Sequence, residues 1–403
     1  MNEKWLYTIS YAAMLLYALV PVTSTAFADN ALRLACLMLL IMIAMRHKLQ
    51  NNGIIKIMAV YSVALIISVL VNPNIKEGLN LTWQRIFEMS PFVIMVTMIQ
   101  NKGRIYSLLK VFLAAMLIAD VTYIYQFSTK FILANNFGYR PSGFFYWEGW
   151  FMQIFLLMVI PICVIMWSEL WNNKRKTERA LIGVTLFLSL IACLMSFSRG
   201  VWLTLVLFLF FYSAIRFHKR TKAFFSIVLG MAVFMAVFMA SFPVVKDRLV
   251  SIFDVNIGPN ANRVLAWQSS WHMFKDYPLF GLGQGNWFTN YKEKYINPAE
   301  TERVPNAHSN YMQLLAETGA IGFSTYMALM LSVLVVASVR WRSAKNNEQR
   351  AGAAIMFFSM ANFLFIGIMG DFKDTRTVVE TLWFTVGAGY VLGNEKEDQK
   401  YCE

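Results

Sequence analysis

Long apolar stretches separated by short polar segments recur along almost the whole chain. Runs of about 17 to 25 apolar residues can cross a bilayer as helices, since each backbone polar group then finds its partner within the segment. The pattern predicts an all-α, polytopic integral membrane bundle with about 12 transmembrane helices. These are expected near residues 8–27, 31–46, 54–72, 88–99, 105–126, 150–171, 180–197, 200–217, 223–243, 319–339, 351–370 and 378–393.

One polar segment is much longer than the others and covers residues 244–318. It divides the chain into about nine N-terminal helices in 1–243, a long outer loop with amphipathic helices in 244–318, three C-terminal helices in 319–393 and a tail in 394–403. A loop of this length in a compact protein is usually functional.

The distribution of charge predicts the orientation of the chain in the membrane. Lys and Arg outnumber Asp and Glu by 36 to 23, which gives a formal net charge of +13. With the N-terminus inside, the short inner loops hold fifteen Lys and Arg and the short outer loops hold seven, in agreement with the positive-inside rule. An even helix count then places both termini in the cytoplasm. Because topology explains the positive charge, nucleic acid is not expected as a partner.

The composition excludes several classes of protein. Hydrophobic residues make up 58% of the chain and charged residues 15%, which argues against a water-soluble enzyme, a disordered protein and a secreted disulfide scaffold. The four cysteines, at positions 36, 163, 193 and 402, show neither metal nor redox spacing. No disulfide, metal site or cofactor is expected.

Arginines on the outer side are the first candidates for chemistry. Arg199 lies at the outer junction of two expected helices, where an arginine pairs with a partner or a ligand or extends to lipid phosphates. Gly200 beside it leaves room for the close approach of backbone or ligand. Arg140 lies in an aromatic turn, and Arg263 follows an asparagine cap on an amphipathic helix. Guanidinium groups bind phosphate oxygens bidentately, so their convergence on one face indicates an anion site, although each alone fits a structural role.

His308 is the candidate general base. Pro305 and Asn306 predict a helix start, so His308 is expected in the first helical turn, where the positive end of the helix dipole favours a neutral imidazole. A neutral imidazole near pH 7 can accept a proton. Tyr311 shares a helical face with His308 and is a candidate for substrate binding. The spacing agrees equally well with a histidine that anchors an interfacial helix.

Asp371 ends the eleventh expected helix on the outer side. It is expected to orient the histidine or an arginine and to bind substrate, with pairing to Lys373 and Arg376 as the alternative. The segment that starts at Gly281 follows no strand and predicts a turn rather than a nucleotide loop. Aromatic residues of the outer loop suit sugar stacking and membrane-interface anchoring equally well: Trp267, Trp271, Tyr277, Trp287, Tyr291 and Tyr295.

With these residues placed, the sequence resembles the O-antigen ligase family, whose pattern many O-antigen and exopolysaccharide polymerases share. Four motifs in the same order and on the same membrane face carry the resemblance. They are Ser198-Arg199-Gly200-Val-Trp202-Leu, Asn262-Arg263 with Trp267, Tyr277-Pro-Leu-Phe-Gly281-Leu-Gly283, and Pro305-Asn-Ala-His308-Ser-Asn-Tyr311 through Glu317-Thr-Gly319.

The resemblance implies a glycosyltransferase of lipopolysaccharide biosynthesis in the bacterial inner membrane, with its active site in the periplasm and no need for metal or ATP. The donor would be a glycan on undecaprenyl diphosphate, and the acceptor a sugar of the lipid A core. The family's catalytic histidine falls on His308, its membrane-edge arginine on Arg199, its loop arginine on Arg263 and its late acidic position on Asp371.

Two alternatives remain open at this point. A polymerase would share the fold and the donor but join carrier-linked repeat units. A transporter of lipid-linked glycans would instead show discontinuous helices and paired charges near the bilayer midplane, whereas the candidate residues gather on one outer face.

Overall fold

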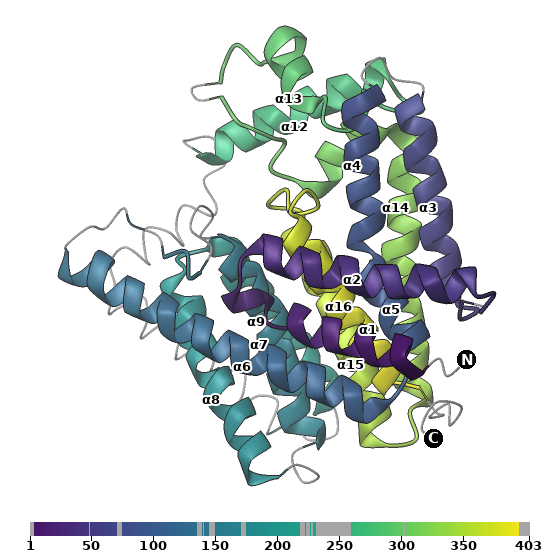
Figure 1. Cartoon of the computed structure of the whole chain (residues 1–403). Coiled ribbons are helices and arrows are strands. Elements are labelled where there is room, and N and C mark those ends of the chain that lie inside the picture. The colour runs from purple at the N-terminus through teal and green to yellow at the C-terminus, as the bar shows by residue number, and fades with distance from the viewer. Residues whose placement is uncertain are drawn as a thin grey trace.

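The computed structural model describes residues 4–47, 49–70, 75–134, 139, 141–144, 150–170, 175–217, 222, 226, 229–230, 259–300 and 303–394. Every regular element in these ranges is a helix (Figure 1). The all-α prediction is therefore confirmed. The expected segment at 223–243 lies almost entirely outside the described residues, and Arg140 lies outside them too.

Eight helices in the described ranges are long and apolar enough to cross a membrane, and the chain is a multi-pass membrane protein. They are α2 (Thr25–Ala44), α3 (Gly53–Leu70), α6 (Lys102–Gln126) with its π-helical extension η2 (Phe127–Leu133), α7 (Trp150–Leu170), α8 (Lys176–Met195), α9 (Arg199–Arg216), α14 (Asn310–Ser343) and α15 (Asn347–Ile366). Shorter helices are α1 (Lys4–Tyr17), α4 (Ile75–Glu88), α5 (Ser90–Met98) and α16 (Arg376–Leu392).

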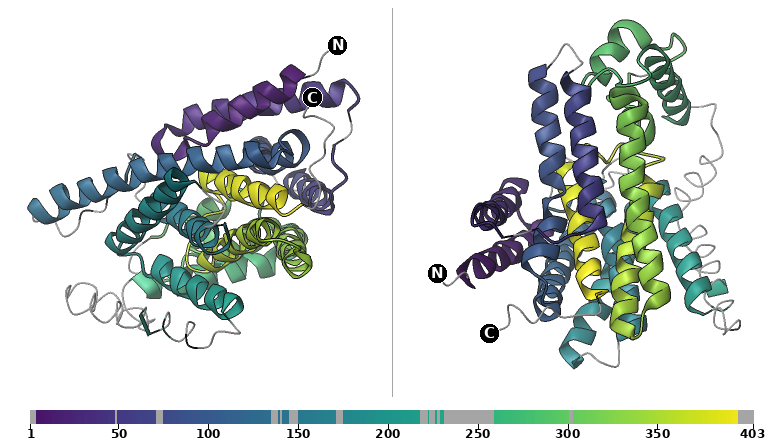
Figure 2. Two further views of the ribbon diagram at one scale, coloured as in Figure 1. Left: turned by 90° about the horizontal axis from the view of Figure 1, so that it is seen from below. Right: turned by 90° about the vertical axis from the view of Figure 1, so that its right-hand side faces the viewer.

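The centre of the bundle is formed by α7, α15 and α16. Helix α16 is buried from Thr377 to Leu392 because α15, α5, α4, α6 and α7 all pack against it. At the crossing of α15 and α16, a Cβ at Gly389 would lie 2.7 Å from the carbonyl oxygen of Gly352. Small residues at such a crossing let two membrane helices approach closely. Figure 2 shows α1 and α2 lying across this bundle, and α3 alongside α14.

The N-terminal helices end and begin at other residues than the hydropathy pattern predicts. The first apolar run, expected as one helix over 8–27, is divided between α1, a 3₁₀ turn at Val20–Val22 and α2. Pro21 lies in that turn, and proline fixes φ and has no N–H to donate. Ser24 then caps α2 by accepting a hydrogen bond from the backbone N–H of Phe27 at 3.2 Å.

Residues 75–88, expected as an outer loop before a short helix near 88–99, form the polar helix α4, followed by α5. Its inward face carries Gly78, Thr82, Arg85 and Glu88, whose spacing follows the helical period. The buried face of α4 is thus polar, which is why an apolar pattern does not reveal it. Helix α4 is an important correction, because it delivers Arg85 to the site described below.

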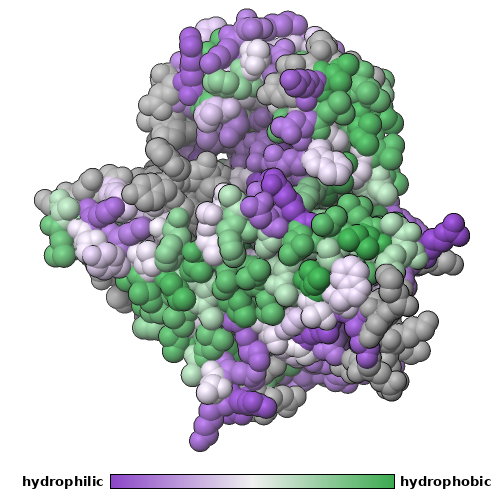
Figure 3. Space-filling view, in the orientation of Figure 1, coloured by the Kyte–Doolittle hydropathy of each residue, from purple (hydrophilic) through white to green (hydrophobic). Residues whose placement is uncertain are grey.

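The described part of the long polar segment forms a cap over one end of the bundle (Figure 1). It contains α12 (Pro259–Asp276), α13 (Trp287–Asn290) and the π-helical turn η4 (Tyr291–Tyr295). The buried positions of α12 follow one face from Asn262 to Met273, and this face mixes polar residues with apolar ones. Trp287 and Tyr291 stack with ring centroids 4.7 Å apart in the core of the cap, so packing accounts for these two aromatic residues. Figure 3 shows hydrophilic residues gathered in a hollow between the cap and a broad hydrophobic band.

Candidate functional site

The cap contacts the bundle at a kink in α14. Gly319 has φ 62° and ψ −166°, which interrupts the helix, and the turn after α12 supplies replacement partners. The N–H of Ala320 donates to the carbonyl of Pro278 at 2.8 Å, and the N–H of Gly283 donates to the carbonyl of Glu317 at 2.8 Å.

Glycine is needed on both sides of this contact. Gly281 also has positive φ, and a Cβ there would lie 2.3 Å from the carbonyl carbon of Glu317. A Cβ at Gly319 would lie 2.5 Å from the carbonyl carbon of Leu279. The expected turn is therefore confirmed, and the third motif and the end of the fourth pack backbone to backbone.

Asn310 joins the start of α14 to the loop that carries Asp371. Its backbone N–H donates to the carbonyls of Gly367 at 2.8 Å and Gly370 at 3.1 Å. Its side-chain Oδ1 accepts from the N–H groups of Phe372 at 2.6 Å and Lys373 at 2.9 Å. Four hydrogen bonds from one residue thus hold this loop beside His308.

Four of the predicted residues line one cavity of about 550 Å³. Arg199 comes from α9, Arg263 from α12, His308 from the segment before α14, and Asp371 from the loop before α16. We call this space the arginine cavity. Its other lining residues are Gln153, Phe197, Ser198, Gly200, Pro305, Asn306, Ile366, Met369, Gly370 and Phe372.

His308 lies just outside α14 rather than in its first turn, because the helix begins at Asn310 with Ser309 as its N-cap. Its backbone is left-handed, with φ 48°, and its N–H donates to Oδ1 of Asn306 at 3.0 Å. Burial, and then the positive charge of Arg263, lowers the pKa of His308 to about 4. A pKa this low keeps the imidazole neutral at pH 7.

Backbone strain is concentrated at this cavity. Phe197, which also lines it, has φ 48° like His308. Left-handed φ is unusual for residues with a Cβ, and it costs of order 1–3 kcal/mol where it occurs. Such strain persists where the surrounding structure enforces it, and it often marks a functional site.

Arg199 begins α9, and its Nη2 donates to Oδ1 of Asn260 at 3.0 Å. This hydrogen bond connects the bundle to the first turn of α12, and the same helix carries Arg263. A Cβ at Gly200 would lie only 2.8 Å from Cδ1 of Ile366. The close approach expected at Gly200 is therefore made by the end of α15.

The Asp371 side chain is only 2% exposed, and its Oδ1 lies 3.8 Å from Nζ of Lys373. Burial is the main cause that raises its pKa. Of the two alternative partners expected from the sequence, Lys373 is the one that pairs with it. Arg376 instead pairs with Asp29 at 3.0 Å and with Glu380 at 2.8 Å. The Tyr311 hydroxyl donates to the carbonyl of Leu364 at 2.6 Å, and Tyr311 is not among the residues that line the arginine cavity.

Residues 184–327 match the family model described as O-antigen ligase. The matched segment, 144 of the 403 residues, is similar to that family. It contains Arg199, Arg263 and His308, while Asp371 lies beyond its C-terminal end. No curated protein matched the chain.

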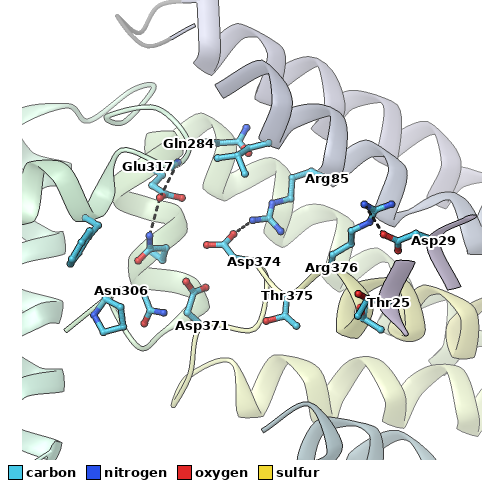
Figure 4. Close-up of a pocket in the computed structure, with 16 residues that line it drawn as sticks. Thr25, Asp29, Arg85, Gln284, Asn306, Glu317, Asp371, Asp374, Thr375 and Arg376 are labelled. Atoms are coloured by element: carbon cyan, nitrogen blue, oxygen red, sulfur yellow. Dashed lines mark hydrogen bonds and ion pairs between the residues drawn. The ribbon is translucent and has the colours of Figure 1, made fainter. Parts of the chain in front are cut away.

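Figure 4 shows a second cavity, also of about 550 Å³. It shares the lining residues Pro305, Asn306 and Asp371 with the first. We call it the carboxylate cavity, because Asp29, Glu317, Asp371 and Asp374 line it. Only part of its wall belongs to the O-antigen ligase segment. The remaining lining residues are Thr25, Leu81, Arg85, Gln284, Gly285, Phe288, Gln313, Thr375, Arg376 and Thr377.

The charged residues around the carboxylate cavity form a connected network that sequence reasoning missed. Arg85 pairs with Glu88 at 3.2 Å and with Asp374. Buried Lys373 pairs with Asp374 at 2.7 Å and with Glu317 at 3.4 Å. One signal was present in the sequence, because Arg85 and Lys373 are two of the few positive charges predicted on the outer side.

Glu317, within the O-antigen ligase segment, connects this network to His308. Its Oε1 accepts from the N–H of Gly285 at 3.2 Å and from Nε2 of Gln313 at 2.8 Å. Oε1 of Gln313 in turn accepts from the N–H of Ala307 at 2.8 Å. A continuous series of polar contacts therefore extends from Lys373 to the backbone that precedes His308.

Proposed function

We propose that this protein is an O-antigen ligase. It transfers a glycan from undecaprenyl diphosphate to a sugar of the lipid A core, at the periplasmic face of the bacterial inner membrane, with both termini in the cytoplasm. The observation that carries the proposal is that Arg199, Arg263 and a half-buried His308 of lowered pKa line one cavity. The family of residues 184–327 supports the same class of reaction.

The arginine cavity suits the leaving group of such a transfer. As the bond between the anomeric carbon and the diphosphate breaks, negative charge develops on the diphosphate oxygen. Fixed guanidinium groups stabilise this charge in a partly dehydrated site, and each can form two parallel hydrogen bonds to phosphate oxygens. In this mechanism Arg199 and Arg263 bind the diphosphate without a metal ion or ATP.

His308 supplies the base. The acceptor hydroxyl attacks the anomeric carbon, its proton passes to the imidazole, and the new C–O bond forms as the bond to the diphosphate breaks. This single displacement inverts the anomeric carbon. Because the charge of Arg263 helps to lower the pKa of His308, a bound diphosphate that offsets this charge makes the imidazole a stronger base. Donor binding thus prepares the histidine for its role.

The experiment is a transfer assay with the purified protein in lipid, using a polyprenyl-diphosphate-linked glycan with and without lipid A core. Wild-type protein is expected to move glycan onto the core. His308→Ala is expected to lose activity by about 10² to 10⁴-fold, the usual contribution of a general base. His272→Ala is the matched control, because His272 is exposed on α12.

Three results would contradict the proposal in different ways. Growth of carrier-linked chains without lipid A core would identify a polymerase with the same chemistry. Normal transfer by His308→Ala would remove this histidine from the mechanism. An inactive wild-type protein with both acceptors would favour a transport function.

A further inference from the structure

The carboxylate cavity has no role in leaving-group chemistry, yet it shares a wall with the arginine cavity. Asp371 and Asn306 belong to that wall, and Asn306 also accepts the backbone hydrogen bond of His308. A group bound in the carboxylate cavity therefore lies next to the space that His308 lines. A nucleophile bound there would be adjacent to the cavity that, in the proposed reaction, holds the diphosphate.

The charges of this cavity select against anions. Among its described lining residues, four carboxylates accompany two arginines, Arg85 and Arg376. Both arginines already have carboxylate partners, since Arg85 pairs with Glu88 and Asp374, and Arg376 pairs with Asp29 and Glu380. A phosphate or carboxylate group entering this space would meet more negative than positive charge.

A buried acceptor atom points to a hydroxyl ligand instead. Oδ1 of Asp371 is buried and has no hydrogen-bond donor within the described part of the chain, since Nζ of Lys373 is 3.8 Å away. Figure 4 shows the Asp371 carboxylate directed toward the space between Asn306 and Asp374. A buried carboxylate oxygen without a donor is costly, and a sugar hydroxyl is a donor that would satisfy it.

One aromatic ring adds a second feature suited to a sugar. Phe288 is the aromatic residue among the described lining residues, and it is 37% exposed. Nζ of Lys292 lies over one face of its ring, 4.0 Å from the centroid, so a sugar would use the other face. An aromatic face carries partial negative charge, and the axial C–H groups of a pyranose are partly positive and apolar. Carboxylates for the hydroxyls and an aromatic face for the ring are together a typical set of contacts for an uncharged sugar.

We propose that the carboxylate cavity is the acceptor subsite, and that it binds a neutral sugar whose attacking hydroxyl is held near Asp371. This inference rests on the proposed function and adds to it the chemical class of the acceptor. The same chemistry fits a sugar of the lipid A core or of a carrier-linked repeat unit, and the test uses both. A phosphomonoester on the accepting sugar is expected to make it a poor acceptor.

The first test fills the mouth of the cavity. Thr25 is exposed and lines the cavity, so Thr25→Trp places a large ring there. The KM for the acceptor is expected to rise at least about tenfold, the effect of losing about 1.4 kcal/mol of binding, while the KM for the polyprenyl-diphosphate-linked glycan stays within about twofold. The matched control is Ala26→Trp, because Ala26 is also exposed and is not among the lining residues.

A second pair of variants tests the same cavity in case Thr25→Trp does not fold. Phe288→Leu removes the aromatic face and is expected to raise the acceptor KM about fivefold, in line with the value of one aromatic contact. Phe274→Leu on α12 makes the same exchange away from both cavities and is expected to leave both KM values unchanged.

The outcomes separate this inference from the proposed function. If the donor KM rises in Thr25→Trp and the acceptor KM does not, the cavity holds the donor glycan and the inference is wrong. Unchanged constants in both Thr25→Trp and Phe288→Leu would also overturn it, as would full activity on a phosphorylated acceptor sugar. A wild-type protein that transfers nothing, or an active His308→Ala variant, instead refutes the proposed reaction.

Discussion

Two cavities of about the same volume share a wall at Pro305, Asn306 and Asp371, yet their charges differ in sign. The arginine cavity contains Arg199 and Arg263, and its acidic lining residue is Asp371. In the carboxylate cavity the acidic residues outnumber the basic ones among those described. A glycosyl transfer needs positive charge at the leaving group and hydrogen-bond acceptors at the nucleophile. The fold thus places a positively charged cavity and an acidic cavity side by side, with Asp371 in the wall between them.

The largest expected effect outside His308 comes from changing the arginine cavity alone. In Arg199→Lys an ammonium group replaces the guanidinium fork, and an ammonium group cannot bind phosphate oxygens bidentately. We expect kcat/KM for the donor to fall about 100-fold, the order of loss for one transition-state donor, with little change in the acceptor KM. Arg33→Lys is the control, since Arg33 is exposed on α2. Wild-type turnover in Arg199→Lys would contradict bidentate diphosphate binding.

A smaller effect is expected where the two cavities are connected. Glu317→Gln removes the carboxylate that pairs with buried Lys373 and accepts from Gln313. We expect kcat to fall about tenfold, because small displacements of catalytic groups lower rates strongly, together with a lower thermal midpoint because Lys373 loses a buried partner. Glu348→Gln, which breaks an ion pair with Lys102 elsewhere in the chain, should lower stability at most and leave kcat unchanged. Equal kcat values in the two variants would show that Glu317 is purely structural.

The dependence of the rate on pH tests the environment of His308. A histidine pKa lowered from 6.5 to about 4 keeps the imidazole neutral until the pH falls close to 4. Because kcat/KM reports the free enzyme, we expect it to stay constant from pH 7 down to about pH 5. Stability should be followed over the same range. The unfolded histidine takes up its proton below about pH 6.5 and the folded one does not, so the free energy of unfolding declines from there. A kinetic acid limb near pH 6.5, with the fold intact, would show that His308 is solvated or that another group is the base.

The smallest effect is expected on removal of divalent cations. If the arginines alone neutralise the diphosphate, dialysis against a chelator should leave the transfer rate within about twofold. The rate should be measured before and after dialysis, and again after Mg²⁺ is restored. A rate lost on dialysis and recovered with Mg²⁺ would mean that the arginine cavity does not suffice for the leaving group.

The site residues that could be predicted from the sequence are charged or titratable residues placed on the outer face, where few such residues occur. Arginines on a face otherwise poor in positive charge, and a histidine beside Pro305 and Asn306, stand out against an apolar background. The structure brings Arg199, Arg263, His308 and Asp371 to one cavity. The local backbone of His308, with its left-handed φ and its hydrogen bond to the Asn306 side chain, leaves no pattern in the sequence.

The charged residues around the carboxylate cavity were not predicted, and one physical reason explains this. Helix α4 buries polar side chains, so hydropathy gave it the appearance of a loop. Arg85 and Lys373 are paired with carboxylates distant in sequence, and such pairings leave no local pattern. The break in the apolar run over 8–27 occurs at Pro21, and proline disrupts helices. The hydropathy pattern does not show this break, because the residues on both sides of Pro21 are apolar.

The packing of Gly281 against Gly319 fixes how many residues can separate the kink in α14 from His308. Eleven positions separate His308 from Gly319, and the backbone hydrogen bonds on either side of the kink leave no freedom to slide. One residue inserted between Asn310 and Thr318 would turn everything before it by about 100° around the helix axis. His308 would then leave the arginine cavity although no side chain had been replaced. Spacing is therefore as strict a requirement here as residue identity, and a relative with the histidine and the glycine at another interval must build its site differently.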